Sequence, residues 1–137
     1  MERWSVAAAG LAHLGLIVVG LQVPRVFRWR EELGRLGESN RILFWTYGGF
    51  IVLANAGFGV LSLLFPGEIA EGRGFAGAFA LFLALYWAAR LACQYAAFRA
   101  ADWPASGRSP WVKHGLGALF LAMALVYLAA FVRGRLA

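Results

Sequence analysis

Long runs of apolar residues alternate with short polar segments along the 137 residues of this chain. Each of the four longest runs reaches about 20 residues, the length of helix that crosses the roughly 30 Å hydrocarbon core of a bilayer. The runs cover residues 5–23, 42–65, 75–98 and 111–132. Charge within them is confined to Arg90 and to Lys113 near the start of the last run. The pattern predicts four membrane-spanning helices, with a tight hairpin at residues 66–74, where turn residues cluster.

We therefore expect an all-α protein, a polytopic four-helix membrane bundle that forms one domain over residues 1–137. The composition agrees, because 61% of the residues are hydrophobic and 15% are charged, whereas about a quarter of a soluble domain is charged. The first run is long for a signal peptide. It is followed by Arg25, Arg28 and Arg30 rather than by small residues that would mark a cleavage site, so we expect it to remain as an anchor.

The net charge of +6 is best explained by topology, and we expect no nucleic-acid partner. Segments 24–41 and 99–113 carry eight basic residues, whereas the segments on the other side carry four. The positive-inside rule assigns the richer segments to the cytoplasm and both termini to the outside. We expect an integral protein of a bacterial inner membrane.

Residues 25–37 carry an amphipathic pattern that predicts a helix lying on the membrane surface. Glu32 is spaced i, i+4 from Arg28, and Arg35 is spaced in the same way from Glu31, which favours ion pairs along such a helix. The apolar residues that share one face of this helix are Val26, Trp29, Leu33 and Leu36.

The third run has two different faces. Alanine recurs at every fourth position, which predicts a seam where another helix approaches closely, either from a second copy or from a partner membrane subunit. The opposite face, about 200° away, carries Tyr86, Arg90 and Gln94, and Trp87 lies three residues before Arg90. A charge inside the membrane marks a functional site by default, and no Asp or Glu in the runs neutralises this one. The alanines of the seam are Ala76, Ala80, Ala84, Ala88, Ala92 and Ala96.

His13 in the first run and Asn55 in the second each lie among small residues, including Gly10, Gly59 and Ser62. Counted from the cytoplasmic ends, these polar residues and Arg90 are roughly 13 to 21 Å deep. They could share one mid-membrane pocket. For His13 and Asn55 taken singly, hydrogen bonding between helices is the better alternative. The predicted ligand-binding residues are Arg90, Tyr86, Gln94, Trp87, His13 and Asn55.

We expect no cofactor, no metal centre and no catalytic residues, and we lean against an enzyme. His114 lies near the start of the fourth run, roughly 10 Å or more from the level of His13, so the two do not suit one haem. The runs contain no carboxylate to complete a zinc or di-iron site. The single cysteine, Cys93, has no partner for an internal disulfide.

The segment Tyr86-Trp87-Ala88-Ala89-Arg90-Leu91, followed by Tyr95 and Arg99, resembles the third-helix pattern of the four-helix membrane glutathione transferases and leukotriene synthases. The resemblance covers about a fifth of the chain. It implies a trimer with its termini outside, in which arginines and tyrosines near the cytoplasmic face hold glutathione. The chain departs from the family pattern at Ser39-Asn40-Arg41, which no acidic residue follows.

Three functions are open on this basis. The first is a module that binds an anionic or amphipathic small molecule or a lipid, with the head group at Arg90. Such a module could also transport its ligand. The second is an accessory or assembly subunit of a larger membrane complex, in which Arg90 pairs with a carboxylate of the partner. The third is the glutathione-dependent membrane enzyme that the resemblance implies.

Overall fold

A computed structural model gives the structure of the chain and describes residues 3–96 and 110–137. Every element in these ranges is helical, and four helices are long and apolar enough to cross a membrane, as predicted. The predicted span end at residue 98 and most of the predicted cytoplasmic segment 99–113 lie outside the described residues. The four long helices are α1 (Arg3–Gly20), α4 (Glu38–Leu64), α6 (Gly74–Ala96) and α7 (Pro110–Leu136).

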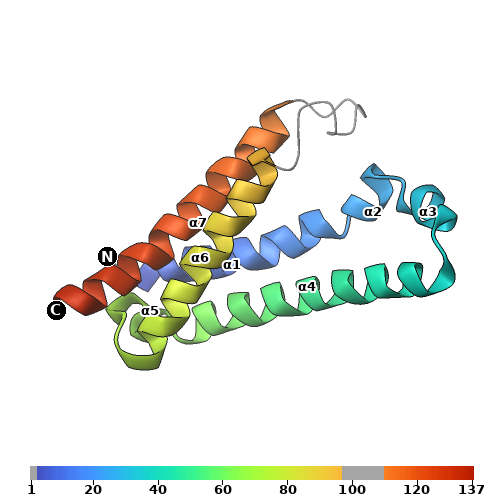
Figure 1. The fold of residues 1–137 in the computed structure, drawn as a ribbon. Helices are drawn as coiled ribbons and strands as arrows, with labels where there is room; N and C mark the ends of the chain where they lie inside the picture. Colours follow the sequence, from blue (N-terminus) through green and yellow to red (C-terminus); the bar gives the residue numbers. More distant parts are fainter. Residues whose placement is uncertain (1–2, 97–109) are drawn as a thin grey trace.

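The four helices form two antiparallel hairpins (Figure 1). Helix α1 packs along α4, and α6 packs along α7. The hairpins meet at the end of the molecule that holds the start of α1 and the end of α7, and we call this the closed end (Figure 1). They diverge toward the opposite end, the open end. Contacts between the hairpins are therefore concentrated in one half of the molecule.

Two glycines allow α1 and α4 to approach closely. A Cβ added at Gly59 would lie 3.0 Å from the carbonyl oxygen of Gly10, and a Cβ added at Gly10 would lie 3.1 Å from the carbonyl oxygen of Gly59. Such distances are tighter than nine in ten real Cβ contacts, so a side chain at either position would require the neighbouring atoms to shift by a few tenths of an ångström. The small residues predicted on one face of each of these spans thus form a contact between the two helices.

A short helix, α5 (Pro66–Glu71), connects the hairpins at the closed end. It packs against α1 and α7 and buries Ile69 and Ala70. Gly72 ends it in the left-handed conformation, with φ of 68°, and its carbonyl lies where a Cβ at Gly77 or Gly134 would be. The connection at residues 66–74 is short, as predicted, and a helix forms most of it, because Pro66 suits the first turn and Gly72 suits the end. The predicted tight hairpin of the second and third spans is wrong, because α4 packs on α1 and α6 packs on α7.

The predicted surface helix at residues 25–37 is broken into short pieces. Arg28 adopts a left-handed backbone conformation, with φ of 51°, which interrupts the helix. The predicted i, i+4 ion pairs are wrong as a consequence, since the carboxylates of Glu31 and Glu32 instead pair at i, i+3 spacing with Arg28 and Arg35. The pieces are α2 (Val23–Val26), α3 (Trp29–Glu32) and the 3₁₀ helix η1 (Leu33–Arg35).

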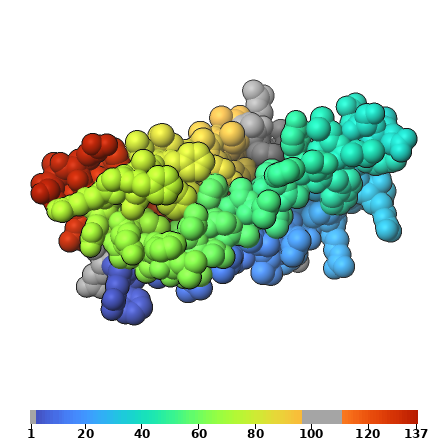
Figure 2. Space-filling model, turned by 90° about the horizontal axis from the view of Figure 1, so that it is seen from below, coloured from blue at the N-terminus to red at the C-terminus, as the bar shows by residue number. Residues whose placement is uncertain are grey.

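The predicted alanine seam on α6 is divided between the inside and the surface of the chain. Ala80 and Ala84 are buried within the chain, whereas Ala88, Ala92 and Ala96 are exposed. The first half of α4 is also uncovered, because residues 38–54 include no buried side chain. Figure 2 shows α4 running along one face of the molecule without a covering helix. These surfaces are not covered by other described parts of the chain.

Candidate functional site

His13 occupies the centre of a hydrogen-bonded contact between the hairpins and is fully buried. Its Nδ1 lies 3.4 Å from Oδ1 of Asn55 on α4, and its Nε2 accepts a bond of 3.3 Å from the indole N–H of Trp87 on α6. The neutral tautomer with the proton on Nδ1 satisfies both partners. Both ring nitrogens of His13 are thus engaged inside the chain.

Asn55 extends this arrangement to a third contact. Its amide Nδ2 donates to the backbone oxygen of Ile51 at 2.9 Å and to the hydroxyl of Tyr86 on α6 at 3.4 Å. One asparagine therefore links α1, α4 and α6. The hydroxyl of Tyr86 acts here as an acceptor, so its own hydrogen is still available to another group.

Aromatic rings enclose the imidazole on several sides. The ring of His13 lies 5.1 Å from Trp87, 5.8 Å from Phe58 and 6.0 Å from Tyr127, measured between centroids. The first two contacts are edge-to-face, which is a favourable geometry for aromatic pairs. We call this set the His13 cluster; its members are His13, Asn55, Phe58, Tyr86, Trp87 and Tyr127.

A second polar contact joins the hairpins nearer the closed end. The hydroxyls of Ser62 on α4 and Tyr127 on α7 are 2.7 Å apart, and both residues are fully buried. In the described residues, every buried side-chain nitrogen and oxygen has a hydrogen-bond partner. Sequence reasoning missed Tyr127, although a hydroxyl in the middle of the most apolar span was a signal that it needed a polar partner.

Arg90 lies one turn beyond Trp87 on α6 and is exposed. Its guanidinium carbon is 5.5 Å from the centroid of the Phe120 ring on α7. That ring packs at 5.0 Å against Trp87, whereas Gln94, farther along α6, bonds to the backbone oxygen of Lys113. The guanidinium is therefore directed back toward the start of α6, as the lean of Cα–Cβ bonds in a helix predicts.

The Phe120 contact does not balance the charge of Arg90. An exposed cation–π contact is worth about 0.5–1 kcal/mol, whereas an arginine at the centre of a bilayer costs about 2.5–3.5 kcal/mol even on insertion scales. Within the described residues, the side chain of Arg90 has neither an ion pair nor a hydrogen bond. A partner for its charge must therefore come from outside the described residues: from the rest of the chain, another subunit, water, lipid or a ligand.

The predicted site residues thus separate into two groups. The structure brings His13, Asn55, Tyr86 and Trp87 together in one cluster. Arg90 lies beside this cluster on the surface, and Gln94 is buried in the α6–α7 contact, where its Nε2 donates to a backbone oxygen at 2.6 Å. As ligand contacts, all six are still predictions.

The other residues that the sequence analysis considered for ligand or metal binding lie apart from one another. His114 lies on α7, with Nδ1 3.3 Å from the hydroxyl of Tyr95, and Cys93 is exposed on α6. Arg99, part of the glutathione-transferase-like pattern, lies outside the described residues. In the ranges that the structure describes, no three His, Cys, Asp or Glu side chains come together in a way that could hold a metal ion.

In comparisons with known proteins, no family model, no curated protein and no solved structure matches this chain.

Proposed function

We propose that this chain is a membrane protein that binds an amphipathic anion, with Arg90 as the group that meets the anionic head. The observation that carries the proposal is the exposed guanidinium of Arg90 on a membrane-length helix, balanced within the described residues only by the Phe120 ring. A charge in that position is stable only with a polar or anionic partner. The predicted site residues Tyr86, Trp87, His13 and Asn55 lie next to it.

Tyr86 supplies a second donor on the same side of α6. It precedes Arg90 by four residues, which places the two side chains about 40° apart around the helix. The hydroxyl of Tyr86 accepts from Asn55 and keeps its own hydrogen for another acceptor. A carboxylate or phosphate beside α6 would accept bonds from both side chains.

The surroundings of Arg90 favour a ligand with an apolar tail. Arg90 lies about 60° around α6 from Trp87, the residue that contacts the other hairpin through His13. It therefore faces the side where α6 and the α1–α4 hairpin diverge (Figure 1). The first half of α4, on the other side of this divergence, presents Ile51 and Tyr47 at its surface, about one and two turns before Asn55, the residue that bonds to Tyr86 of α6. An alkyl chain in this region would contact apolar side chains while its head group stays at Arg90.

The test uses two ligands that differ only in the head group. Oleate has a carboxylate and oleyl alcohol has none, so their affinities for the purified full chain in a non-ionic detergent isolate the anion. We expect Arg90→Leu to weaken oleate binding by roughly tenfold or more, because a hydrogen bond to a charged group is worth about 1.5–3 kcal/mol. Oleyl alcohol should bind as before. Arg90→Lys should give an intermediate affinity, since it keeps the charge and loses the guanidinium fork.

Arg73→Leu is the matched control, because it removes an exposed arginine at the closed end. It should leave oleate binding unchanged. If Arg90→Leu binds oleate as tightly as the unmodified protein, the proposal is wrong. Circular dichroism should show that Arg90→Leu keeps its helix content and unfolding temperature, because the substitution removes a charge that has no buried partner.

A second candidate, an accessory or assembly subunit, is favoured by the exposed part of the alanine seam. Ala88, Ala92 and Ala96 form a small-residue surface at the open end of α6, the kind of surface that lets helices approach closely in membranes. Native mass spectrometry of gently extracted protein would report the stoichiometry. A stoichiometric second chain would support this function, whereas a stable monomer or a closed homo-oligomer would count against it.

A further inference from the structure

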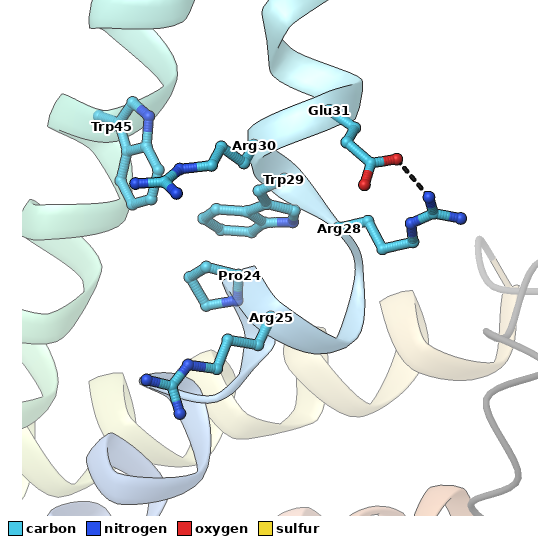
Figure 3. Close-up of a pocket in the computed structure, with 7 residues that line it drawn as sticks. All are labelled: Pro24, Arg25, Arg28, Trp29, Arg30, Glu31 and Trp45. Carbon is cyan, nitrogen blue, oxygen red and sulfur yellow. Dashed lines mark hydrogen bonds and ion pairs between the residues drawn. The ribbon is translucent and has the colours of Figure 1, made fainter.

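A basic and aromatic hollow lies at the open end of the molecule, where α2 and α3 meet the start of α4 (Figure 3). Its volume is about 580 Å³ and it is open to the surroundings. It is separate from the His13 cluster and from Arg90, so a ligand in the hollow would be independent of the proposed function. The residues that line it are Pro24, Arg25, Arg28, Trp29, Arg30, Glu31 and Trp45.

Aromatic packing holds the hollow in place. The ring of Trp29 on α3 lies edge-on to two rings of α4, at 4.7 Å from Phe44 and 5.4 Å from Trp45. These contacts hold the segment of short helices α2, α3 and η1 against the start of α4. Within the described residues, the indole N–H groups of Trp29 and Trp45 form no hydrogen bond. Indoles of this kind belong at the head-group level of a bilayer, where one edge is wet and the ring is apolar.

The charges of the hollow are arranged asymmetrically. Figure 3 shows Arg25 and Arg30 extending to the side of α4, with the rings of Pro24 and Trp29 between them. Arg28 extends to the other side, where it pairs with Glu31. Within the described residues, the guanidinium groups of Arg25 and Arg30 have neither an ion pair nor a hydrogen bond. Two uncompensated positive charges therefore flank an apolar wall.

We propose that this hollow binds the phosphate group of an anionic membrane lipid. The guanidinium fork matches phosphate oxygens, which accept two parallel N–H bonds from it. The volume corresponds to roughly 20 water molecules, which is more than a bare phosphate fills and suits a glycerophosphate head group with the first part of its chains. Pro24, Trp29 and Trp45 supply the apolar surface that such chains contact.

The left-handed backbone at Arg28 has a clear consequence for this site. By interrupting the helix, it sends Arg28 and Glu31 to one side and leaves Arg25 and Arg30 on the other. On a continuous helix, positions 25 and 30 would lie about 140° apart. The break therefore brings the two free charges to one face of the segment.

The experiment measures lipid binding to the full chain by native mass spectrometry from a non-ionic detergent. The probes are phosphatidylglycerol, phosphatidylcholine and inorganic pyrophosphate, which separate an anionic lipid, a zwitterionic lipid and a soluble phosphate. The test variant is Arg25→Gln with Arg30→Gln. The matched control is Arg35→Gln with Arg41→Gln, which removes the same charge from the same segment outside the hollow. A third variant, Arg25→Lys with Arg30→Lys, keeps the charge.

We expect the test variant to lose roughly tenfold or more of its affinity for phosphatidylglycerol, since each arginine near a lipid surface is worth about 1 kcal/mol. The control should lose less than half as much on a logarithmic scale, and the lysine variant should fall between the two. Phosphatidylcholine and pyrophosphate should bind more weakly than phosphatidylglycerol. All four arginines are exposed, so circular dichroism should be unchanged.

Three results would overturn the proposal. Equal losses in the test and control variants would mean that diffuse surface charge attracts the lipid. Equal binding of phosphatidylcholine would remove the selectivity for an anion. Pyrophosphate that binds more tightly than phosphatidylglycerol, and competes with it, would assign the hollow to a soluble phosphate compound instead of a lipid.

Discussion

The imidazole of His13 and the indole of Trp87 are joined by a hydrogen bond of 3.3 Å that connects α1 to α6. This bond lies between residues 74 positions apart and belongs to the small set of polar contacts that fix one hairpin against the other. Because water is absent from the hydrocarbon region, a polar group there must find its partner within the protein. The hydrogen bond thus helps to fix the position of one hairpin relative to the other in an otherwise apolar contact.

His13→Ala should therefore destabilise the bundle. It removes a fully buried side chain packed on three rings and leaves the amide oxygen of Asn55 and the indole N–H of Trp87 without this partner. We expect a loss of about 2–4 kcal/mol, comparable with large-to-small substitutions in cores. The measurement is denaturant-induced loss of helix in detergent, followed by circular dichroism. His114→Ala, at an exposed histidine, is the control and should change little.

The contact between α1 and α4 predicts a different response at two nearby glycines. Gly59→Leu should destabilise the protein by about 1–3 kcal/mol, because a side chain there meets the backbone of Gly10 and the two helices must separate. Gly57→Leu should have little effect, since no atom lies within 4 Å of a Cβ at that position. Thermal unfolding of both variants would decide. Equal effects would show that helix propensity, rather than close approach, controls this region.

The alanine seam is buried within the chain in its first half and exposed in its second half, so larger side chains should have different effects in the two halves. Ala84→Leu should lower the unfolding temperature of the isolated chain, because Ala84 is buried. Ala92→Leu should leave that temperature unchanged, because Ala92 is exposed. If a second copy or another subunit packs on the seam, Ala92→Leu should instead reduce the oligomer size seen in native mass spectrometry. Unchanged size would mean that this part of the seam faces lipid.

Topology is testable with single cysteines in a Cys93→Ala background, since Cys93 is exposed. Gly37→Cys and Glu71→Cys occupy exposed positions at opposite ends of the long helices. An impermeant thiol reagent applied outside intact cells should label position 71 and reach position 37 only after permeabilisation. Gly72 is a poor choice for this purpose, because it is buried with φ of 68° and has no room for a side chain. Labelling of position 37 in intact cells would reverse the orientation.

Hydrophobic run length was enough to predict the four spanning helices, because a bilayer demands about 20 apolar residues from each of them. The small and polar faces of the first two spans were also predictable, and Gly10, Gly59 and Asn55 do lie in contacts between helices. Both follow from local spacing, which a helix preserves.

The arrangement of the site was not predictable in the same way. Depth and helical face predicted that Arg90 and Gln94 lie with His13, but Arg90 is exposed and Gln94 is bonded to α7. The hairpins diverge toward the open end (Figure 1), and the periodicity along one helix does not report the angle between two pairs of helices. The break at Arg28 was equally hidden. A left-handed arginine is uncommon, and the docking of Trp29 onto Phe44 and Trp45, residues of another helix, accompanies it.

The contacts between the hairpins are concentrated at the closed end, so a small change in the angle between the two hairpins would displace the open end most. Helix α4 continues for 17 residues from Asn55 back to Glu38, a distance of about 26 Å. A rotation of only about 5° at the His13 cluster would therefore displace the start of α4, and the hollow beside it, by about 2 Å. Small side-chain rearrangements in the His13 cluster would thus open or close the far end by about half the width of a methyl group.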